Sequence, residues 1–336
     1  MIPSLLPRLL RGESLTEEEA QAVIGHVMDG EASEAQIAGL LVALRAKGES
    51  VSEIVGAARA MRAHAIAVAP RRTDLVDTCG TGGDGLRTFN VSTTAGLVAA
   101  GAGAGVAKHG NRAVSSASGS ADVLEALGVR LDLPAARVAE CIDEVGFGFL
   151  FAPAHHPAMR HAGPVRSSLG VRTIFNVLGP LTNPVGARRQ LVGVFDEALV
   201  LPIAETLREL GSERALVVHG FEGLDELSPA GPSMCADASP AGVTVGTIDP
   251  AALGLAPSRT EDLAGGDAAT NARLLRALLD GERGPRRDAV ALNAGAALVA
   301  AGLADDLPAG LTLATSAIDD GRARLTLDRL VEFTNA

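Results

Sequence analysis

Aromatic side chains are scarce in this chain of 336 residues, which contains eight phenylalanines but no tryptophan and no tyrosine. Hydrophobic residues still make up 47% of the sequence, so we expect a core of aliphatic side chains and alanine with closely packed elements. Lysine is almost absent, because only Lys47 and Lys108 occur and arginine supplies the rest of the positive charge. The length suits two domains or one large α/β domain.

The chain also lacks the features of several protein classes. Its three cysteines, Cys79, Cys141 and Cys235, are odd in number and far apart, which predicts neither a disulfide framework nor a zinc site. No uncharged apolar run reaches the roughly 18 residues needed to span a bilayer, and the first residues lack the order of a signal peptide. We therefore expect a cytoplasmic protein with no membrane partner.

The net charge of the chain is strongly negative. At −11 it argues against a general nucleic-acid binder, which needs basic stripes on its surface, so we expect no nucleic-acid partner. A small phosphorylated ligand is still compatible with this charge, since the local field around a site decides whether an anion binds.

Residues 1 to about 66 are predicted to form consecutive helices. Apolar residues spaced for one helical face, among them Ile37, Leu40 and Leu44, predict burial on one side. Three helix starts carry a capping box, in which a hydroxyl residue is followed three positions later by Glu or Gln: Thr16 with Glu19, Ser33 with Gln36, and Ser50 with Glu53. We expect a small all-helical domain over residues 1–70.

From residue 71 onward, short apolar runs alternate with helical segments. Strands are predicted near 75–76, 104–108, 148–151, 190–195 and 215–219, and helices over 93–102, 121–127 and 134–145. Such alternation predicts an α/β fold: a large domain over residues 71–163 and 189–336, with a mostly parallel central sheet covered by helices, beside the small all-helical domain. Residues 164–188, which contain two turns ending in proline, form either a long loop between domains or a return of the chain to the helical domain.

A glycine-rich segment after the first predicted strand is the most informative part of the sequence. It reads Gly80-Thr81-Gly82-Gly83-Asp84-Gly85, the glycine loop, and leads to a hydroxyl-rich helix start at Asn90-Val91-Ser92-Thr93. Between Asp84 and Asp122 no acidic residue occurs, although Arg87, Lys108 and Arg112 do. Backbone amides, a helix N-terminus and local positive charge predict a site for an anion, above all phosphate.

Other meanings of the glycine loop fit less well. It matches the dinucleotide pattern G-x-G-x-x-G, but that pattern needs an acidic residue about 20 positions on for the ribose, and this interval has none. A Walker-type loop needs Gly-Lys-Ser or Gly-Lys-Thr, which does not follow. A tight strand-to-helix turn without a ligand is the remaining structural alternative.

Polar donors also crowd the segment 108–116. Lys108 offers a point charge and Arg112 a forked donor, while Asn111, Ser115 and Ser116 offer neutral hydrogen bonds. The alternative is a solvated loop. Because ligands bind at the carboxyl ends of parallel strands, we expect this segment, the glycine loop and the segment that starts at Gly220 to meet at one edge of the sheet.

Two further candidates lie later in the chain. Asp225 and Glu226, in a loop bounded by glycine and proline, suit a hard cation such as Mg²⁺ that also binds phosphate oxygens, although such a pair alone is usually solvated surface. The histidine-rich run 155–161 has no zinc-ligand spacing. Arg166 follows a Gly-Pro turn and can pair with a substrate carboxylate, or else form a structural salt bridge.

Taken together, these segments resemble the anthranilate phosphoribosyltransferases of tryptophan biosynthesis over nearly the whole chain. The resemblance is carried by the glycine loop with 90–93, by Lys108-His109-Gly110-Asn111-Arg112, by 163–184 with Arg172-Thr173-Ile174-Phe175-Asn176, by 223–226 and by 287–293. It implies Mg²⁺-dependent transfer of the phosphoribosyl group from phosphoribosyl pyrophosphate to anthranilate. It also implies a hinge between the domains and a homodimer formed through the helical parts.

The same resemblance implies site residues, each at the matching position of this sequence. Donor contacts are implied for Gly80, Gly83, Asp84, Thr88, Asn90, Val91, Ser92, Thr93, Lys108, His109, Gly110, Asn111, Arg112, Ala113, Val114, Ser115, Ser116 and Ser120. Anthranilate contacts are implied for Gly80, Asn111 and Arg166, and magnesium ligands for Ser92, Asp225 and Glu226. No catalytic residue is implied, since the aromatic amine is neutral at pH 7 and catalysis rests on positioning and leaving-group stabilisation.

Three other functions compete with this interpretation. A pyrimidine-nucleoside phosphorylase shares the general fold, but its His-Thr-Gly-Gly-Thr-Leu-Asp-Lys signature is absent. A catalytically silent relative that only binds nucleotides is disfavoured by the presence of Ser92, Lys108, Asp225 and Glu226. A helical scaffold that dimerises through residues 1–66 leaves the glycine loop unexplained.

Overall fold

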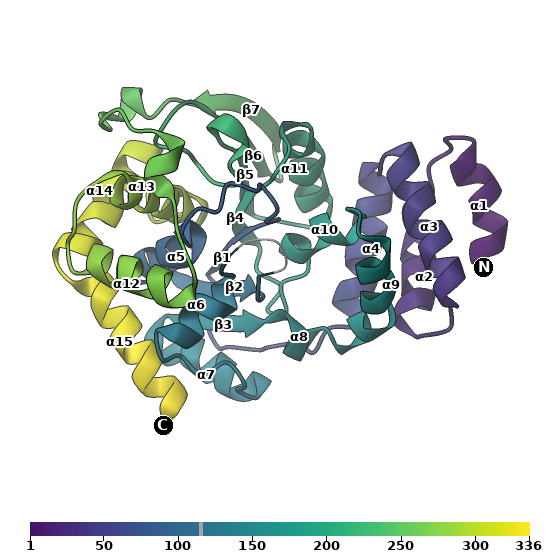
Figure 1. Ribbon diagram of the computed structural model, residues 1–336, viewed down its shortest axis with the longest axis horizontal. Helices are drawn as coiled ribbons and strands as arrows, with labels where there is room; N and C mark the ends of the chain where they lie inside the picture. The colour runs from purple at the N-terminus through teal and green to yellow at the C-terminus, as the bar shows by residue number, and fades with distance from the viewer. Residues whose placement is uncertain (114–116) are drawn as a thin grey trace.

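The computed structural model describes residues 1–113 and 117–336, so the donor candidates Val114, Ser115 and Ser116 lie outside the described residues. A small group of helices lies at one end of the molecule, and a larger body is built around a sheet at the other (Figure 1). The predicted fold class, a small helical domain with a large α/β domain, is confirmed.

The helical group begins with four consecutive helices: α1 (Ile2–Leu10), α2 (Glu17–Met28), α3 (Glu34–Lys47) and α4 (Val51–Ala63). The three predicted capping boxes are confirmed at the starts of α2, α3 and α4, where hydroxyl and carboxyl or amide side chains satisfy exposed backbone N–H groups. Ile37, Leu40 and Leu44 are buried, as their spacing predicts.

The chain returns to this helical group after the third strand. The returning elements are α8 (Ala152–His155), η1 (Pro157–His161), α9 (Gly163–Leu169), α10 (Phe175–Leu178) and η2 (Gly179–Leu181). Of these, η1 contacts α2, α9 contacts α3 and α10 contacts α4. Residues 157–178 therefore rest on the helices that begin the chain, as Figure 1 shows.

The central sheet has seven strands in the order β3-β2-β1-β4-β5-β6-β7. Five are parallel neighbours: β1 (Leu75–Gly80), β2 (Gly105–Gly110), β3 (Phe147–Phe151), β4 (Arg189–Gly193) and β5 (Arg214–His219). The strands β6 (Ser233–Ser239) and β7 (Gly242–Ile248) form an antiparallel hairpin beside β5. The sequence predicted the five buried strands but not this hairpin, because β7 is an edge strand with mostly exposed residues and no continuous apolar run.

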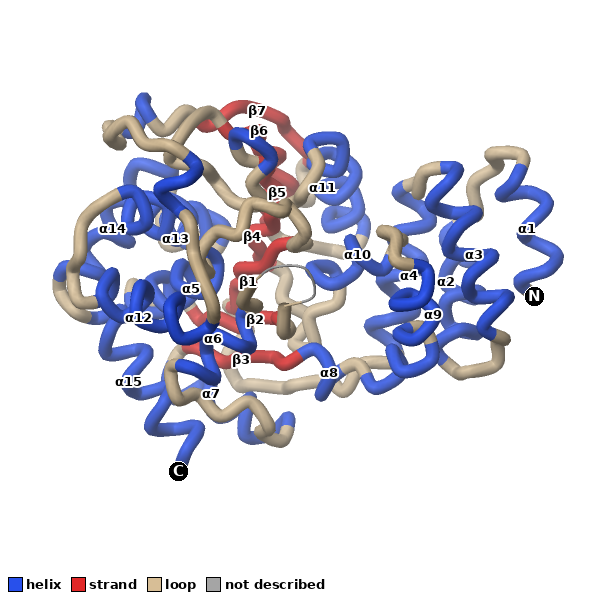
Figure 2. Tube along the Cα trace, viewed as in Figure 1, coloured by secondary structure: helices blue, strands red, loops and turns tan. Residues whose placement is uncertain are grey.

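Helices cover both faces of the sheet (Figure 2). The remaining helices are α5 (Val91–Gly101), α6 (Ser120–Ala126), α7 (Ala135–Val145), α11 (Val200–Glu209), α12 (Ala268–Leu279), α13 (Pro285–Ala300), α14 (Leu307–Asp319) and α15 (Arg322–Asn335). Leu40 of the helical group and Val192 of β4 belong to one hydrophobic cluster, so the helical group and the sheet share apolar packing. Within the described residues, no helix has the length and apolar character needed to cross a membrane.

Candidate functional site

Segments far apart in the sequence meet at the carboxyl edge of the parallel strands. The glycine loop, residues 80–85, begins at the end of β1, and Asp225 and Glu226 follow β5. The Gly82 N–H donates to Asp225 Oδ2 at 2.7 Å, and the Ser92 N–H near the start of α5 donates to Glu226 Oε1 at 3.1 Å. The carboxylate pair thus lies directly against both the glycine loop and the helix start.

The backbone of the glycine loop explains its composition. Gly82 and Gly83 have φ angles of +65° and +82°, a region that glycine adopts without the strain other residues would incur. A neighbouring glycine is needed for close approach: a Cβ on Gly193 at the end of β4 would lie 1.5 Å from the Asp225 carbonyl oxygen. Gly193 was not among the predicted site residues, since only the folded chain places it against Asp225.

Three carboxylates gather at this edge. Glu226 is buried, with 8% of its surface exposed, and Asp225 is half-buried. Burial and the nearby Asp84 carboxylate raise the pKa of Asp225, while burial and Asp225 raise the pKa of Glu226. Asp84 Oδ2 is buried and has no hydrogen-bond partner within the described residues. The site therefore concentrates negative charge that a cation would neutralise.

The donor chemistry fits magnesium better than a metal with a closed protein cage. Within residues 1–113 and 117–336, no three His, Cys, Asp or Glu side chains are arranged to hold a metal ion by themselves. Mg²⁺ is commonly held by one or two carboxylates and completed by water and substrate phosphates. Asp225 and Glu226 match that partial donor set, and Ser92, whose backbone N–H donates to Glu226, adds a hydroxyl to the same place.

Lys108 lies beneath this site and not on a solvated loop. Only 2% of its surface is exposed. Its Nζ donates to the Thr78 carbonyl oxygen and, at 3.3 Å, to Ser92 Oγ. Burial lowers the Lys108 pKa, an effect opposed by the charge of Asp77 and, less strongly, of Glu226. The ammonium thus supplies buried positive charge directly behind Ser92.

A second buried network joins the sheet edge to the returning chain. Asp77 Oδ1 accepts the His109 backbone N–H at 3.1 Å, and Asp77 Oδ2 accepts a hydrogen bond from Asn183 Nδ2 at 2.8 Å. The same amide donates to the Ala107 carbonyl oxygen at 2.8 Å. Neither Asp77 nor Asn183 was predicted as a site residue. The Asn-Pro dipeptide at 183–184 indicated only a turn, and nothing in the sequence paired it with Asp77.

Two histidines close to this network are buried and neutral. His109 Nδ1 lies 3.0 Å from the Gly179 carbonyl oxygen, and the His109 and His156 ring centroids are 5.1 Å apart. Burial lowers the pKa of His109 to about 3 and that of His156 to about 4. Both rings are therefore uncharged near pH 7 and add no positive charge to the site.

Arg166 lies on α9, on the helical side of the molecule. Its guanidinium carbon is 5.2 Å from the centroid of the Phe175 ring, and burial lowers its pKa. Among the described residues Arg166 forms no ion pair, so the alternative of a structural salt bridge is not observed. Gly80 and Asn111 lie at the sheet edge, and no hydrogen bond between described residues joins either of them to Arg166.

Other donor candidates take different positions. Arg112 pairs with Asp122 at 3.2 Å and with Glu125 at 2.6 Å, so its guanidinium is directed toward α6. Val91 and Thr93 are each 1% exposed, and the Val91 N–H already donates to the Phe89 carbonyl oxygen at 2.8 Å, so neither residue presents a free surface to a ligand in this structure. Several other donor candidates make hydrogen bonds within the protein that stabilise this edge. They are Asn90 Nδ2 to the Ser118 carbonyl, Ser120 Oγ to the Asn111 carbonyl, Ala113 N and Gly119 N to Asp122, and a backbone bridge from Thr88 to Ala264.

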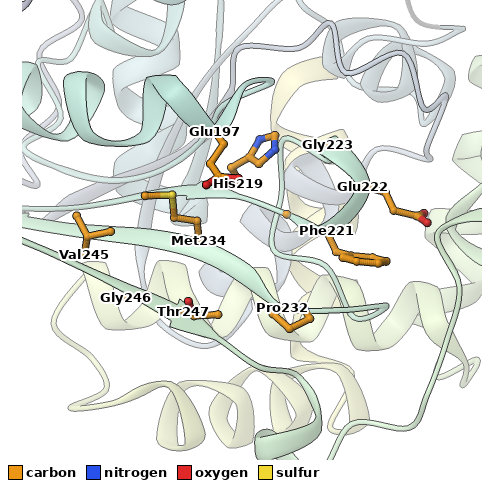
Figure 3. Close-up of a pocket in the computed structure, with 11 residues that line it drawn as sticks. Glu197, His219, Phe221, Glu222, Gly223, Pro232, Met234, Val245, Gly246 and Thr247 are labelled. Carbon is orange, nitrogen blue, oxygen red and sulfur yellow. The ribbon is translucent and has the colours of Figure 1, made fainter.

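A pocket of about 680 Å³ opens farther along the same edge, between the ends of β5, β6 and β7 (Figure 3). Glu197, His219, Phe221, Glu222 and Met234 are among its lining residues. Its lining includes two glutamates and neither lysine nor arginine, so its charge does not suit an anionic donor.

Family comparisons agree with this architecture. Residues 3–65 match the helical bundle domain of a glycosyl transferase family, and residues 72–324 match the a/b domain of that family. An anthranilate phosphoribosyltransferase from Desulforudis audaxviator strain MP104C is 54% identical over 334 residues, which cover 99% of this chain and 96% of that protein. The enzyme of the same name from Symbiobacterium thermophilum is 52% identical, with 99% and 97% covered.

Solved structures give the same result. The anthranilate phosphoribosyltransferase from Thermus thermophilus superposes with a TM-score of 0.94 at 50% identity, covering 98% of this chain and 99% of that one. The enzyme from Saccharomyces cerevisiae, solved in complex with PRPP and Mg, gives a TM-score of 0.92 at 27% identity, covering 99% and 98%. Fold, sequence and coverage agree, and this chain belongs to the anthranilate phosphoribosyltransferase family.

Proposed function

We propose that this protein transfers the phosphoribosyl group of 5-phosphoribosyl 1-pyrophosphate to the amine of anthranilate in tryptophan biosynthesis. The products are N-(5-phosphoribosyl)anthranilate and pyrophosphate. The proposal rests on two hydrogen bonds, from the Gly82 N–H to Asp225 and from the Ser92 N–H to Glu226. They place a carboxylate pair against an anion-binding loop and a helix start. The 54% identity to an enzyme of this name supports the choice of substrates.

The donor half of the proposed site lies at the glycine loop and at the start of α5. Backbone N–H groups and the positive end of the α5 dipole favour the phosphate groups of the donor. Lys108 adds a buried positive charge behind Ser92. These groups would stabilise the negative charge that develops on the departing pyrophosphate, which is the main electrostatic demand of the reaction.

Magnesium is the proposed cofactor, with Asp225, Glu226 and the Ser92 hydroxyl as the protein groups that would hold it. The raised pKa values of the two carboxyls, and an Asp84 oxygen that has no hydrogen-bond partner among the described residues, support a cation at this place. When bound, Mg²⁺ supplies charge neutralisation to the phosphate oxygens of the donor. The solved complex of the yeast relative with PRPP and Mg is consistent with this assignment.

The acceptor half of the proposed site is organised by Arg166, whose guanidinium would pair with the anthranilate carboxylate. The aromatic amine of anthranilate is neutral at pH 7 and needs no strong base. Because His109 and His156 are buried and neutral, they would not repel the positive charge that forms on the ribose as pyrophosphate leaves. Catalysis would then rest on positioning the amine against the anomeric carbon.

A homodimer formed through the helical parts is also proposed. Leu10 is 76% exposed and Val42 is 46% exposed, so α1 and α3 present apolar side chains on the outer surface of the helical group. Apolar side chains of this kind suit a partner surface of the same chemistry.

Purified protein with Mg²⁺, anthranilate and phosphoribosyl pyrophosphate is expected to consume anthranilate, seen as a loss of its fluorescence with equimolar release of pyrophosphate. The chain contains no tryptophan and no tyrosine, so its own emission does not obscure the measurement. Protein that leaves anthranilate untouched and instead cleaves thymidine in the presence of phosphate would overturn the proposal in favour of a nucleoside phosphorylase.

Arg166→Ala is expected to raise the KM for anthranilate by about 10- to 100-fold, with a smaller change in the KM for the donor. A hydrogen bond to a charged group contributes roughly 1.5–3 kcal/mol, and 1.4 kcal/mol is about tenfold in affinity. The matched control is Arg160→Ala, which removes an exposed arginine from η1, the preceding turn. If Arg166→Ala changed only the donor KM, the carboxylate role of Arg166 would be wrong.

A further inference from the structure

Arg172 reaches from the returning chain to the glycine loop. It lies between α9 and α10, the two helices that rest on α3 and α4 of the helical group. Its Nη2 nevertheless donates to the carbonyl oxygen of Gly83, which belongs to the α/β body. One side chain thus connects the two parts of the molecule at the mouth of the proposed donor site.

The guanidinium is held in this position from a second direction. Its central carbon lies 3.8 Å from the centroid of the Phe195 ring, a short cation–π distance. Phe195 follows β4, and its backbone N–H donates to Thr81 Oγ1 of the same glycine loop at 3.1 Å. Thr81 in turn donates its own N–H to the Gly193 carbonyl oxygen at 2.9 Å. Arg172 therefore contacts both the glycine loop and Phe195, the residue whose backbone N–H donates to that loop.

The glycine loop consequently accepts or donates hydrogen bonds on two sides. On the side of the α/β body, Gly82 N–H donates to the Asp225 carboxylate at 2.7 Å. On the helical side, the Gly83 carbonyl accepts from Arg172. These two contacts hold the peptide groups on either side of the Gly82–Gly83 pair, and both of these glycines have positive φ angles. A loop rich in glycine has high conformational freedom, so such contacts decide how often it holds an anion-binding shape.

The same segment carries Arg166. Arg166 stacks on Phe175, which lies three residues after Arg172, so the proposed acceptor group and the loop contact share one short piece of chain. Fixing Arg166 with a carboxylate would therefore restrict the segment that positions Arg172. By linkage, any such effect on donor affinity is matched by an equal effect of the donor on acceptor affinity.

We propose that Arg172 is a positioning residue that holds the glycine loop in its anion-binding conformation and couples occupation of the donor half to occupation of the acceptor half. The proposal rests on the proposed function for the identity of the two ligands. It requires no contact between Arg172 and either substrate, because the side chain acts through the Gly83 carbonyl.

The test compares Arg172→Ala, Arg172→Lys and Phe195→Leu with the wild type. We expect Arg172→Ala to raise the donor KM by about 10- to 100-fold, the range set by one charged hydrogen bond and one cation–π contact. Lysine retains a charge but neither the fork nor the flat stacking surface, so Arg172→Lys is expected to recover only part of the loss. The double variant Arg172→Ala with Phe195→Leu is expected to have a donor KM no higher than that of Arg172→Ala, because both substitutions disrupt the same Arg172–Phe195 contact.

Calorimetry separates coupling from simple support. The dissociation constant of Mg²⁺–pyrophosphate is measured with and without benzoate, which keeps the acceptor carboxylate but has no amine to react. In the wild type, benzoate is expected to change pyrophosphate affinity, and in Arg172→Ala this factor is expected to fall to about one. Neither probe is turned over, so this measurement does not depend on activity. If the wild type proves inactive with anthranilate, only the proposed function fails, and the role of Arg172 is still decided by the coupling factor.

Arg188→Ala is the matched control, because Arg188 is also exposed and donates to a glycine carbonyl, that of Gly211 at 3.0 Å, far from the glycine loop in the sequence. It is expected to leave both KM values and the coupling factor unchanged. A donor KM for Arg172→Ala equal to that of the wild type would overturn the proposal. So would a lower Tm with an unchanged coupling factor, since that result describes a structural brace.

Discussion

Asp225→Asn combined with Glu226→Gln is expected to lower kcat/KM for phosphoribosyl pyrophosphate by about 100- to 1,000-fold. Charge stabilisation by a bound metal contributes several kcal/mol, and about 1.36 kcal/mol corresponds to tenfold in rate. The amides keep the size of the side chains and an oxygen that can accept from Gly82 and Ser92, so the loss reports on charge. Steady-state rates measured over a series of Mg²⁺ concentrations should show a higher requirement in the variant.

The same double variant is expected to be more stable than the wild type when chelator is present, and increasingly so as the pH rises. Burial raises the pKa of both carboxyls above their ordinary values of 3.8 and 4.5. A carboxyl whose pKa is higher in the folded chain stabilises the fold at low pH, and this contribution is lost as the pH rises through the raised value. The difference in Tm between variant and wild type should therefore be larger at pH 8 than at pH 5.

Glu222→Gln provides the control for this pair. Glu222 is an exposed carboxylate in the turn that leads to Asp225, and its side chain makes no hydrogen bond or ion pair among the described residues. Its substitution is expected to leave the Mg²⁺ requirement and the pH dependence of Tm as in the wild type. If Asp225→Asn with Glu226→Gln retained the wild-type rate at low Mg²⁺, the two carboxylates would not be magnesium ligands.

Local sequence signals account for much of the fold. Each capping box, such as Thr16 with Glu19, needs only residues three positions apart, and the structure has all three. Buried parallel strands are visible in the sequence as apolar runs, as at 148–151. The hairpin of β6 and β7 was missed because its strand residues are partly or mostly exposed and no local pattern indicates their pairing.

Those parts of the site that lie directly after a strand could be predicted from the sequence. The glycine loop, Asp225 and Glu226 each follow a predicted strand, and parallel strands present their carboxyl ends at one edge. Contacts across long stretches of chain were not predictable in this way. Asp77 and Asn183 are 106 residues apart, and Gly83 and Arg172 are 89 apart, so only the folded chain pairs them. Lys108 was predicted at the end of a strand, in a segment of polar donors, but its burial was not predicted: it lies inside β2 with its Nζ 3.3 Å from Ser92 Oγ at the start of α5.

Lys108→Met is expected to lower the free energy of unfolding by about 1–3 kcal/mol, the cost of leaving buried hydrogen-bond partners unsatisfied, here the Thr78 carbonyl and the Ser92 hydroxyl. Methionine matches the length and flexibility of lysine but leaves Asp77 and Glu226 without the cation whose charge acts on both. The loss should be larger at pH 8 than at pH 5, because at low pH these carboxyls are more readily protonated. Urea unfolding at the two pH values measures the effect.

The second variant in this series keeps the prediction testable if Lys108→Met folds poorly. Adding Glu226→Gln removes one of the carboxylates that the lysine offsets while retaining an oxygen for the Ser92 N–H. The combination Lys108→Met with Glu226→Gln is therefore expected to be more stable than Lys108→Met alone. If Glu226→Gln stabilised Lys108→Met by no more than it stabilises the wild type, the two changes would be independent and the electrostatic explanation would be contradicted.

The other lysine of the chain provides a matched control for activity. Lys47 of α3 also has a buried side chain, and its Nζ lies 2.8 Å from the fully buried Glu53 carboxylate. Lys47→Met should lower stability for the same physical reason, yet leave kcat per folded molecule at the wild-type level, because Lys47 lies in the helical group. Lys108→Met should lower both quantities, since the site loses the buried positive charge behind Ser92 that would help to stabilise the departing pyrophosphate. Equal kcat values for the two variants would show that Lys108 serves the fold and not the reaction.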